Sequence, residues 1–237
     1  MRNKSIRKYY DLLHKKRFQL ILKRLFDIIA SAVLIVLLLV FFIIIAAVIR
    51  IDSNGPAIYK QIRVTKYGRK FKILKFRTML HNPASGGHQV TVKGDSRITK
   101  AGKFLRRTRL DELPQLFNII SGDMSFVGCR PEVLKYVDAY TDEMMATLLL
   151  PAGVTSPASI QYKDEERLLS ETKNVDNTYI SEILPAKMKL NLSYIESFSF
   201  LGDIAVMFQT VAAVAGRSDE PEKAAEEAVK HDDKVGV

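Results

Sequence analysis

The longest apolar stretch of the chain is an unbroken run of 22 residues, from Ile28 to Ile49, without a charge, proline or glycine. A helix needs about 20 such residues to cross a bilayer, and a buried core helix of this length is rarely apolar on every face. The run begins too late and extends too far for an ordinary signal peptide. The pattern therefore predicts a membrane-inserted helix within residues 23–51, after a basic segment at 1–22.

Both flanks of this run are strongly basic. Nine Lys and Arg residues precede residue 25, against the single acid Asp11, and nine more lie between Arg50 and Arg77. Cationic loops prefer the cytoplasmic side, and a re-entrant helix would keep both flanks there. However, the run has no Pro or Gly to bend it, and broken backbone in lipid needs hydrogen-bond partners. The residues leave both forms open, and the flanks lead us to expect a re-entrant rather than a spanning helix, with both termini cytoplasmic.

Three charged residues stand just before the apolar run. Lys23 and Arg24 precede Asp27 by four and three residues, which places them on one helical face. One interpretation is that the two cations bind phospholipid headgroups while Asp27 fixes the angle at which the helix enters the membrane. The other is that they are flanking charges that snorkel to the interface. Both interpretations assign these residues to membrane anchoring.

After a turn signal at residues 52–56 the pattern changes to short segments of strand-like and helix-like periodicity. It predicts a β-hairpin at 57–79 with its turn at Gly68, then a loop at 81–96 and a basic helix at 98–109. A helix that begins at Pro114 and ends at Gly122 follows. Further along, the pattern predicts a helix at 133–150, a loop at 151–157 and apolar–aromatic helices at 187–216. We therefore expect an α+β fold, in which the membrane helix precedes a small, mostly helical cytoplasmic domain at 52–216 with a short β-hairpin and interfacial helices. The acidic, Ala-rich residues 217–237 are typical of a partly disordered tail.

Composition narrows the partners. The 237 residues carry a net charge of +10, which favours an anionic partner. Nucleic acid is the least favoured, because the basic residues flank a hydrophobic anchor and no nucleic-acid-binding motif is present. A single cysteine, Cys129, excludes an internal disulfide and a cysteine zinc cluster.

The candidate chemistry lies between residues 106 and 132. Two adjacent carboxylates, Asp111 and Glu112, stand among four guanidinium groups just before the helix predicted from Pro114, and these groups belong to Arg106, Arg107, Arg109 and Arg130. The N-terminal end of a helix attracts anions. An N-cap role for Asp111 and a solvated face for the arginines explain each residue singly. Together, the acid pair and its cations favour a phosphate site.

Three segments together resemble a known family. They are KRLFD before the apolar run, GPAIYKQIRV followed by GRKFKILKFRTM, and RLDELPQLFNIISGDMSFVGCRPE. The chain resembles the small, monotopic bacterial phosphoglycosyl transferases, the initiating sugar transferases that act on polyprenol phosphate, from about Lys23 to Glu132 and more weakly to Gly216. The third segment is the most specific.

The resemblance implies a reaction and a location. A UDP-sugar donates its sugar-1-phosphate to a membrane polyprenol phosphate, and UMP leaves, in the first membrane step of exopolysaccharide, O-antigen or glycoprotein glycan assembly. The enzyme would lie in the bacterial inner membrane among phospholipids, with residues 52–216 as the catalytic domain. The resemblance does not decide whether the enzyme forms a homodimer.

The resemblance also implies roles for single residues. Asp111 would attack the donor's β-phosphate and form a covalent phosphosugar intermediate, and Glu112 would help it hold Mg²⁺. Arg130 would bind phosphate. We expect further contacts to the substrate from the cations near this motif, namely Arg107, Arg109, Arg77 and Lys75.

The chain also departs from the family's pattern. Leu39-Val40 stands where a Ser-Pro pair usually breaks the membrane helix, Cys129 replaces a proline, Gly153-Val-Thr-Ser-Pro157 replaces a Gly-x-Thr-Gly-Trp segment, and Asn191 replaces an aspartate. Donor specificity is therefore not carried over. Two alternatives stay open: a non-catalytic membrane-anchored binder of anionic lipid or polymer, and a degenerate transferase.

Overall fold

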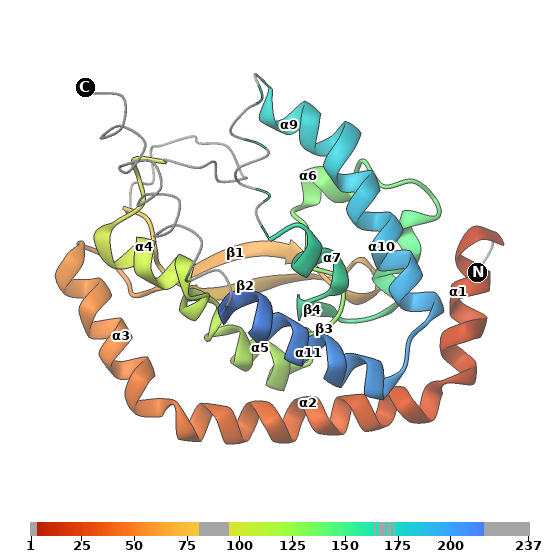
Figure 1. The fold of residues 1–237 in the computed structure, drawn as a ribbon, viewed down its shortest axis with the longest axis horizontal. Coiled ribbons are helices and arrows are strands. Elements are labelled where there is room, and N and C mark those ends of the chain that lie inside the picture. The colour runs from red at the N-terminus through yellow and green to blue at the C-terminus, as the bar shows by residue number, and fades with distance from the viewer. Residues whose placement is uncertain are drawn as a thin grey trace, which may run out of the picture.

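The computed structural model describes residues 4–80, 95–163, 165, 169, 172 and 174–215. The described chain is a mixed helical and β structure, in which a long bent helix pair curves around one side of a small domain (Figure 1). The first elements along the chain are α1 (Lys4–Lys15), α2 (Arg17–Leu37), α3 (Leu39–Asp52), β1 (Ile58–Val64), η1 (Lys66–Gly68), β2 (Lys70–Phe76), α4 (Lys100–Arg107), η2 (Leu110–Glu112) and α5 (Gln115–Ser121). They are followed by β3 (Met124–Val127), α6 (Leu134–Val137), η3 (Met144–Leu149), β4 (Ala152–Thr155), α7 (Pro157–Gln161), α9 (Val175–Thr178), η4 (Tyr179–Ile183), α10 (Leu184–Glu196) and α11 (Phe200–Ala215).

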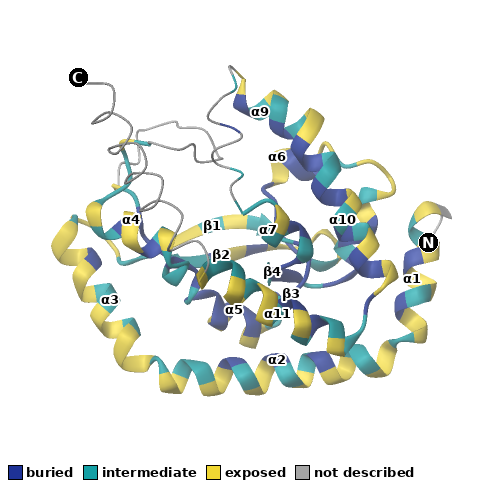
Figure 2. Cartoon of the chain, viewed as in Figure 1, coloured by how far each residue is buried: buried dark blue, intermediate teal, exposed yellow. Residues whose placement is uncertain are grey.

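The predicted membrane helix is two helices, α2 and α3, which meet at Leu38 at an angle of 64°. Within the described residues no single helix is long and apolar enough to cross a membrane, whereas this bent pair passes that test on length and composition. The absence of Pro and Gly therefore did not prevent a bend. Side chains on both arms, Leu34 of α2 and Phe42 of α3, pack against one hydrophobic cluster of the domain. Packing to a common core thus accompanies the bend, while the outer face of both arms stays exposed and apolar (Figure 2).

The β-hairpin is confirmed. β1 and β2 pair in antiparallel register, with Tyr59 opposite Lys75 and Ile58 opposite Phe76. Gly68 lies in the turn with a φ of 74°, a left-handed conformation that glycine adopts without a side-chain clash. The hairpin packs against α5, where the Asn118 side chain accepts from Leu74 N–H (2.9 Å) and donates to the Lys72 carbonyl (2.9 Å).

A second sheet was not predicted. β3 and β4 form a two-stranded parallel pair, so the segment 151–157, which we expected to be a loop, contains a strand. Each strand has only four residues, which is too short for a period of two to be recognised. Gly128 and Gly153 lie so close that a Cβ on Gly153 would collide with the Gly128 backbone.

The helix predicted over residues 133–150 is wrong. Only the short α6 and the 3₁₀ segment η3 form there, because the two ends belong to different cores. Tyr136 packs in one cluster with residues of α10, whereas Leu149 packs in another with α1. A single straight helix cannot face both clusters, and the chain turns between them, with the Thr141 hydroxyl accepting from Met144 N–H.

The other predicted helices are confirmed as α4, α5, α10 and α11, and Gly122 ends α5 with a φ of 84°. The basic N-terminal segment also forms a helix, α1, whose Tyr9 and Leu13 are buried in a hydrophobic cluster with residues of α10. The loop expected at 81–96 lies largely outside the described residues, as does the tail at 217–237.

Candidate active site

The acid pair lies on η2, a single turn between α4 and α5. Arg109, which precedes it, has a φ of 58°, so the chain reverses sharply at this point. The flanking Leu110 and Leu113 pack against a hydrophobic cluster. Asp111 and Glu112 are only 7% and 9% exposed. Both carboxylates are thus held in a largely desolvated position one turn ahead of α5, as the sequence predicted.

Three cations from separate segments converge on one oxygen of Glu112. Its Oε1 lies 2.9 Å from Arg130 Nη2, 3.1 Å from Lys75 Nζ and 3.7 Å from Arg109 Nη1. Burial by itself would raise the pKa of Glu112, but Arg130, Lys75 and Arg109 outweigh it and hold that pKa well below its ordinary range. Glu112 therefore remains a carboxylate, and its second oxygen accepts no hydrogen bond from a described residue.

Asp111 has the opposite environment. No described residue donates a hydrogen bond to its carboxylate, although Lys75 and Arg109 contribute an attractive field. Burial raises the pKa of Asp111 above its ordinary value, and the neighbouring Glu112 charge adds to the rise. A carboxylate whose pKa is raised in this way, next to one whose pKa is lowered, is a candidate for a functional role.

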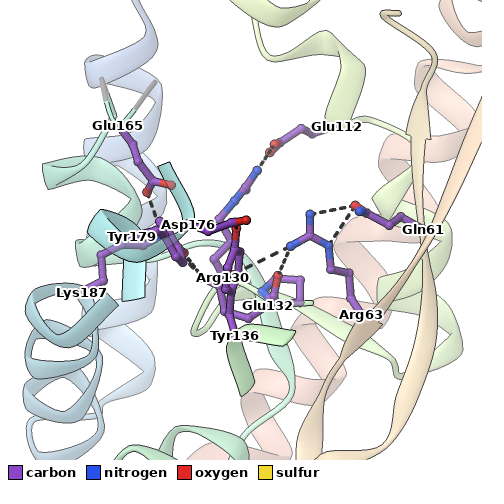
Figure 3. A network of polar contacts seen from close by, with 11 residues as sticks. Gln61, Arg63, Glu112, Arg130, Glu132, Tyr136, Glu165, Asp176, Tyr179 and Lys187 are labelled. Atoms are coloured by element: carbon purple, nitrogen blue, oxygen red, sulfur yellow. Dashed lines mark hydrogen bonds and ion pairs between the residues drawn. The ribbon is translucent and has the colours of Figure 1, made fainter. Parts of the chain in front are cut away.

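A polar network lies behind Arg130 (Figure 3). Glu132 accepts from the Tyr179 hydroxyl at 2.6 Å and lies 3.6 Å from Lys187 Nζ. Arg63 donates to the Pro131 carbonyl at 3.2 Å. These contacts hold the segment that carries Arg130. Sequence reasoning did not single out Glu132, Arg63 or Lys187 as site residues, because their partners come from distant parts of the chain.

Two predicted substrate-binding arginines lie elsewhere. Arg77 is only 4% exposed, and its guanidinium donates to the carbonyls of Ser53 (2.6 Å) and Asn54 (2.7 Å), where it holds the end of α3. Arg107 is exposed, and its guanidinium carbon lies 6.0 Å from the centre of the Phe104 ring. The structure thus gathers Lys75, Arg109 and Arg130 around Glu112 but brings neither of these two arginines to it.

The three predicted anchoring residues contact the domain. Lys23 is buried and bonds to Asp203 of α11 (2.5 Å) and to the Val127 carbonyl (2.8 Å). Arg24 donates to two carbonyls at the end of α5. Asp27 accepts from Phe126 N–H at 3.2 Å. These side chains therefore tie α2 to β3, α5 and α11.

The departures from the family's pattern are mostly buried. Cys129 is 7% exposed, and burial raises the pKa of its thiol to about 12, so it is an unreactive thiol. Its carbonyl accepts from Gly153 N–H at 2.9 Å, which links β4 to the segment that leads into Arg130. Asn191 lies inside α10 and is 2% exposed.

The metal-binding capacity of the site rests on two carboxylates. Among the described residues no group of three or more His, Cys, Asp or Glu side chains is arranged to hold a metal ion. Asp111 and the free oxygen of Glu112 could supply two oxygen ligands, which suits an ion that takes its other ligands from water or substrate phosphates.

Comparison with known proteins supports the same chemistry. A family model described as bacterial sugar transferase matches residues 18–217. The chain is 34% identical, over 81% of its length, to a UDP-N-acetylgalactosamine-undecaprenyl-phosphate N-acetylgalactosaminephosphotransferase of Aeromonas hydrophila, of which the match covers 43%. It is 33% identical, over 81% of its length, to a UDP-glucose:undecaprenyl-phosphate glucose-1-phosphate transferase of Klebsiella pneumoniae, of which the match covers 40%.

A shorter relative matches along most of its length. The uncharacterized sugar transferase EpsL of Bacillus subtilis is 32% identical over 82% of this chain and 88% of its own length. The chain spans less than half of the Aeromonas and Klebsiella proteins, and the segment it shares with all three contains the acid pair and its cations.

Proposed function

The chain belongs to the bacterial sugar transferases, and on that basis we propose that it transfers a sugar-1-phosphate from a UDP-sugar to undecaprenyl phosphate. The products would be a polyprenol diphosphate sugar and UMP, at the start of glycan assembly. The observation that carries the proposal is the buried acid pair, in which three cations surround one carboxylate and no described residue donates a hydrogen bond to the other.

Asp111 is the nucleophile in this proposal. One of its carboxylate oxygens attacks the β-phosphorus of the donor, an oxygen–phosphorus bond forms, and the bond to UMP breaks with its electron pair leaving on the UMP oxygen. A phosphate oxygen of the polyprenol phosphate then attacks the same phosphorus, and the Asp111 carboxylate is released. Its environment supports this role, because a carboxylate that accepts no hydrogen bond from a described residue needs little reorganisation before attack.

The cations around Glu112 would serve the donor. Arg130 and Lys75 lie beside the acid pair and offer a fork and a point charge to phosphate oxygens. Glu112 holds both in place before the donor binds, and we propose that they share their charge with the diphosphate afterwards. Arg109, at 3.7 Å, is the third member of this set.

Mg²⁺ fits the carboxylate pair. Asp111 and the second oxygen of Glu112 would hold the ion together with donor phosphate oxygens, and the ion would offset the negative charge of the diphosphate. Two protein carboxylates are a typical protein contribution to a magnesium site that also binds substrate phosphates.

We further propose that α2 and α3 form a re-entrant anchor in the bacterial inner membrane, with the domain on the cytoplasmic side. Two contacts support this arrangement: Asp27 bonds to β3 just before the apolar run, and Arg77 bonds to Ser53 just after it. One small domain cannot contact both ends of a helix that crosses a bilayer, because about 30 Å of hydrocarbon would separate them.

The reaction is tested by UMP release from several UDP-sugars with undecaprenyl phosphate in detergent or nanodiscs. We expect release to need Mg²⁺ and to fall by about 10³-fold or more in Asp111→Asn. Intact-protein mass spectrometry of the wild type with donor alone should show a sugar-phosphate adduct that Asp111→Asn lacks. Asp123→Asn, outside the acid pair, is the control. Undiminished turnover in Asp111→Asn would exclude the nucleophile, and no turnover in the wild type with any donor would favour the non-catalytic alternative.

The topology is tested by labelling a cysteine added ahead of Met1 in intact cells, since the native Cys129 is buried. We expect an impermeant maleimide to label it only after the inner membrane is opened, as it should a second probe cysteine at the exposed Lys189. Labelling of the N-terminal probe from outside, with Lys189→Cys protected, would mean that the helix pair spans the membrane.

A further inference from the structure

A cavity of about 720 Å³ lies where α3 joins β1. Its walls come from Ala46 and Arg50 on α3, from the connection at residues 54–57 and from Ile58 and Lys60 on β1. The reaction proposed above assigns it no role. The cavity stands at the point where the apolar anchor ends and the domain begins.

The cavity is separate from the acid pair. Lys75, which contacts Glu112, is opposite Tyr59 in the hairpin, and neighbouring residues on a strand project from opposite faces. Lys60 therefore projects from the face opposite to Lys75. Phe76 lies on the same face as Lys60 and packs against Ile49, so the end of α3 lies against the face of the hairpin that carries Lys60.

Two cations without counter-charges line this cavity. Arg50 and Lys60 are both exposed, and neither has an ion-pair or hydrogen-bond partner within the part of the chain that the structure describes. The nearest acid along the chain, Asp52, instead accepts from Ala101 N–H at 3.1 Å, at the start of α4. The cavity thus presents two positive charges that no carboxylate of its walls neutralises.

An apolar stripe leads into the same cavity. Ile43, Ala46 and Arg50 are spaced by three and four residues, so they share one face of α3. Ile43 is 63% exposed, and the small Ala46 leaves room beside the helix. Along two helical turns the surface therefore changes from apolar to cationic. A phospholipid changes in the same order, from its acyl chain to its phosphate.

We propose that this cavity binds the headgroup of an anionic phospholipid, with the phosphodiester between Arg50 and Lys60 and an acyl chain along Ile43 and Ala46. The inference rests on the proposed membrane placement of α2 and α3 and goes beyond the transferase reaction. A phospholipid fits better than the polyprenol acceptor, because the acceptor's phosphate must reach Asp111 on the other face of the hairpin. The bound lipid would hold the returning end of the anchor at the membrane surface.

The experiment measures flotation of the full-length protein with phosphatidylcholine vesicles and with phosphatidylcholine vesicles that contain phosphatidylglycerol. We expect wild type to prefer the vesicles that contain phosphatidylglycerol. In Arg50→Gln/Lys60→Gln this preference should fall by about fivefold to thirtyfold, which corresponds to the attraction of one to two basic side chains to an anionic membrane surface. Ala46→Leu narrows the cavity where the acyl chain would lie and keeps both charges, so it should also lose the preference, with thermal melts reporting whether each variant is folded.

The matched control is Lys70→Gln/Lys189→Gln, which removes two exposed cations outside the cavity and should keep most of the preference. A loss in this control as large as in Arg50→Gln/Lys60→Gln, or an unchanged preference in folded Ala46→Leu, would overturn the site in favour of general surface charge. Displacement of phosphatidylglycerol by polyprenyl phosphate would assign the cavity to the acceptor and overturn the proposed occupant. If wild type floats with neither kind of vesicle, the proposed membrane placement of α2 and α3 is wrong, whatever the outcome of the UMP assay.

Discussion

Asp111 and Glu112 are neighbours in sequence and both nearly buried, yet their surroundings shift their pKa in opposite directions. Three cations contact one oxygen of Glu112, while Asp111 interacts with Lys75, Arg106 and Arg109 through their charges alone and receives no hydrogen bond from a described residue. The negative charge of Glu112 is therefore stabilised by the cations that it holds in place. The negative charge of Asp111 is destabilised by burial. Such a difference is common where two acids take different parts in one reaction.

Asp111→Asn should stabilise the fold while it removes activity. Because burial raises the folded-state pKa of Asp111, its negative charge costs stability at neutral pH, and the uncharged amide removes that cost. We expect a gain of about 0.5–1.5 kcal/mol, or about 2–5 °C in Tm, by differential scanning fluorimetry at pH 7. The gain should shrink as pH falls through the raised folded-state pKa and vanish below about pH 4, where the acid is protonated in both states.

Glu112→Gln is the matched comparison, and its effect should have the opposite sign. It removes the counter-charge of Lys75 and Arg130, whose side chains are 22% and 31% exposed, so a loss of about 1–3 kcal/mol is expected. Both substitutions replace a carboxylate by an amide and change the net charge of the protein by the same amount. Destabilisation by both would show that the two carboxylates have similar environments, against the structure.

At the scale of elements, two four-residue strands position Arg130. β3 leads through Gly128 and Cys129 to Arg130, and β4 fixes this path because Gly153 N–H bonds to the Cys129 carbonyl. The strands approach so closely at Gly128 and Gly153 that neither position has room for a Cβ. A short parallel pair thus controls the geometry of Arg130, the arginine that we propose binds phosphate.

Gly153→Ala should therefore damage both stability and catalysis. Its Cβ would meet the Gly128 backbone, which has no flexible side chain to move aside. We expect a loss of about 2–4 kcal/mol in chemical denaturation and a fall in kcat/KM of about tenfold or more, because the path to Arg130 must shift. Gly68→Ala is the control: its Cβ would meet nothing within 4 Å, and only its φ of +74° is strained, so a cost of about 1 kcal/mol with unchanged kcat/KM is expected. Equal effects of the two substitutions would contradict the role of the strand contact.

At the scale of the whole molecule, one buried ion pair connects three distant parts of the chain. Lys23 of α2 bonds to Asp203 of α11 and to the last carbonyl of β3, and the Tyr194 hydroxyl donates to the other oxygen of Asp203 at 2.8 Å. The anchor, the strand that leads to the active site and the last described helix therefore meet at a desolvated point. Buried pairs of this kind are costly to break from one side.

Lys23→Met should destabilise the wild-type protein more than it destabilises the Asp203→Asn variant. The single substitution leaves the Asp203 carboxylate buried without its cation, at a cost of about 3–5 kcal/mol, and the second substitution removes that unpaired charge. Denaturation of all four proteins in one detergent gives the coupling free energy, expected to be at least about 1 kcal/mol. Additive effects would mean that the two side chains act independently.

The sequence by itself determined the features that depend on local pattern. The apolar run, the hairpin with its turn at Gly68, the helix between Pro114 and Gly122, and the acid pair just ahead of that helix are encoded by residues that are neighbours in the chain. The specific string around Asp111 also determined the family, because a motif is a local property. Which sugar is transferred is encoded in neither the motif nor its spacing.

Only the tertiary structure decided which distant residues meet. Lys75 joins Glu112, but Arg77, two residues later, lies just beyond the end of β2 and turns to Ser53 at the end of α3. Lys23, expected to anchor the chain at the membrane, is buried against Asp203, 180 residues away along the chain. The bend at Leu38 has no proline or glycine to announce it, and both arms pack on one core. Such contacts depend on the packing of whole elements, which local periodicity does not contain.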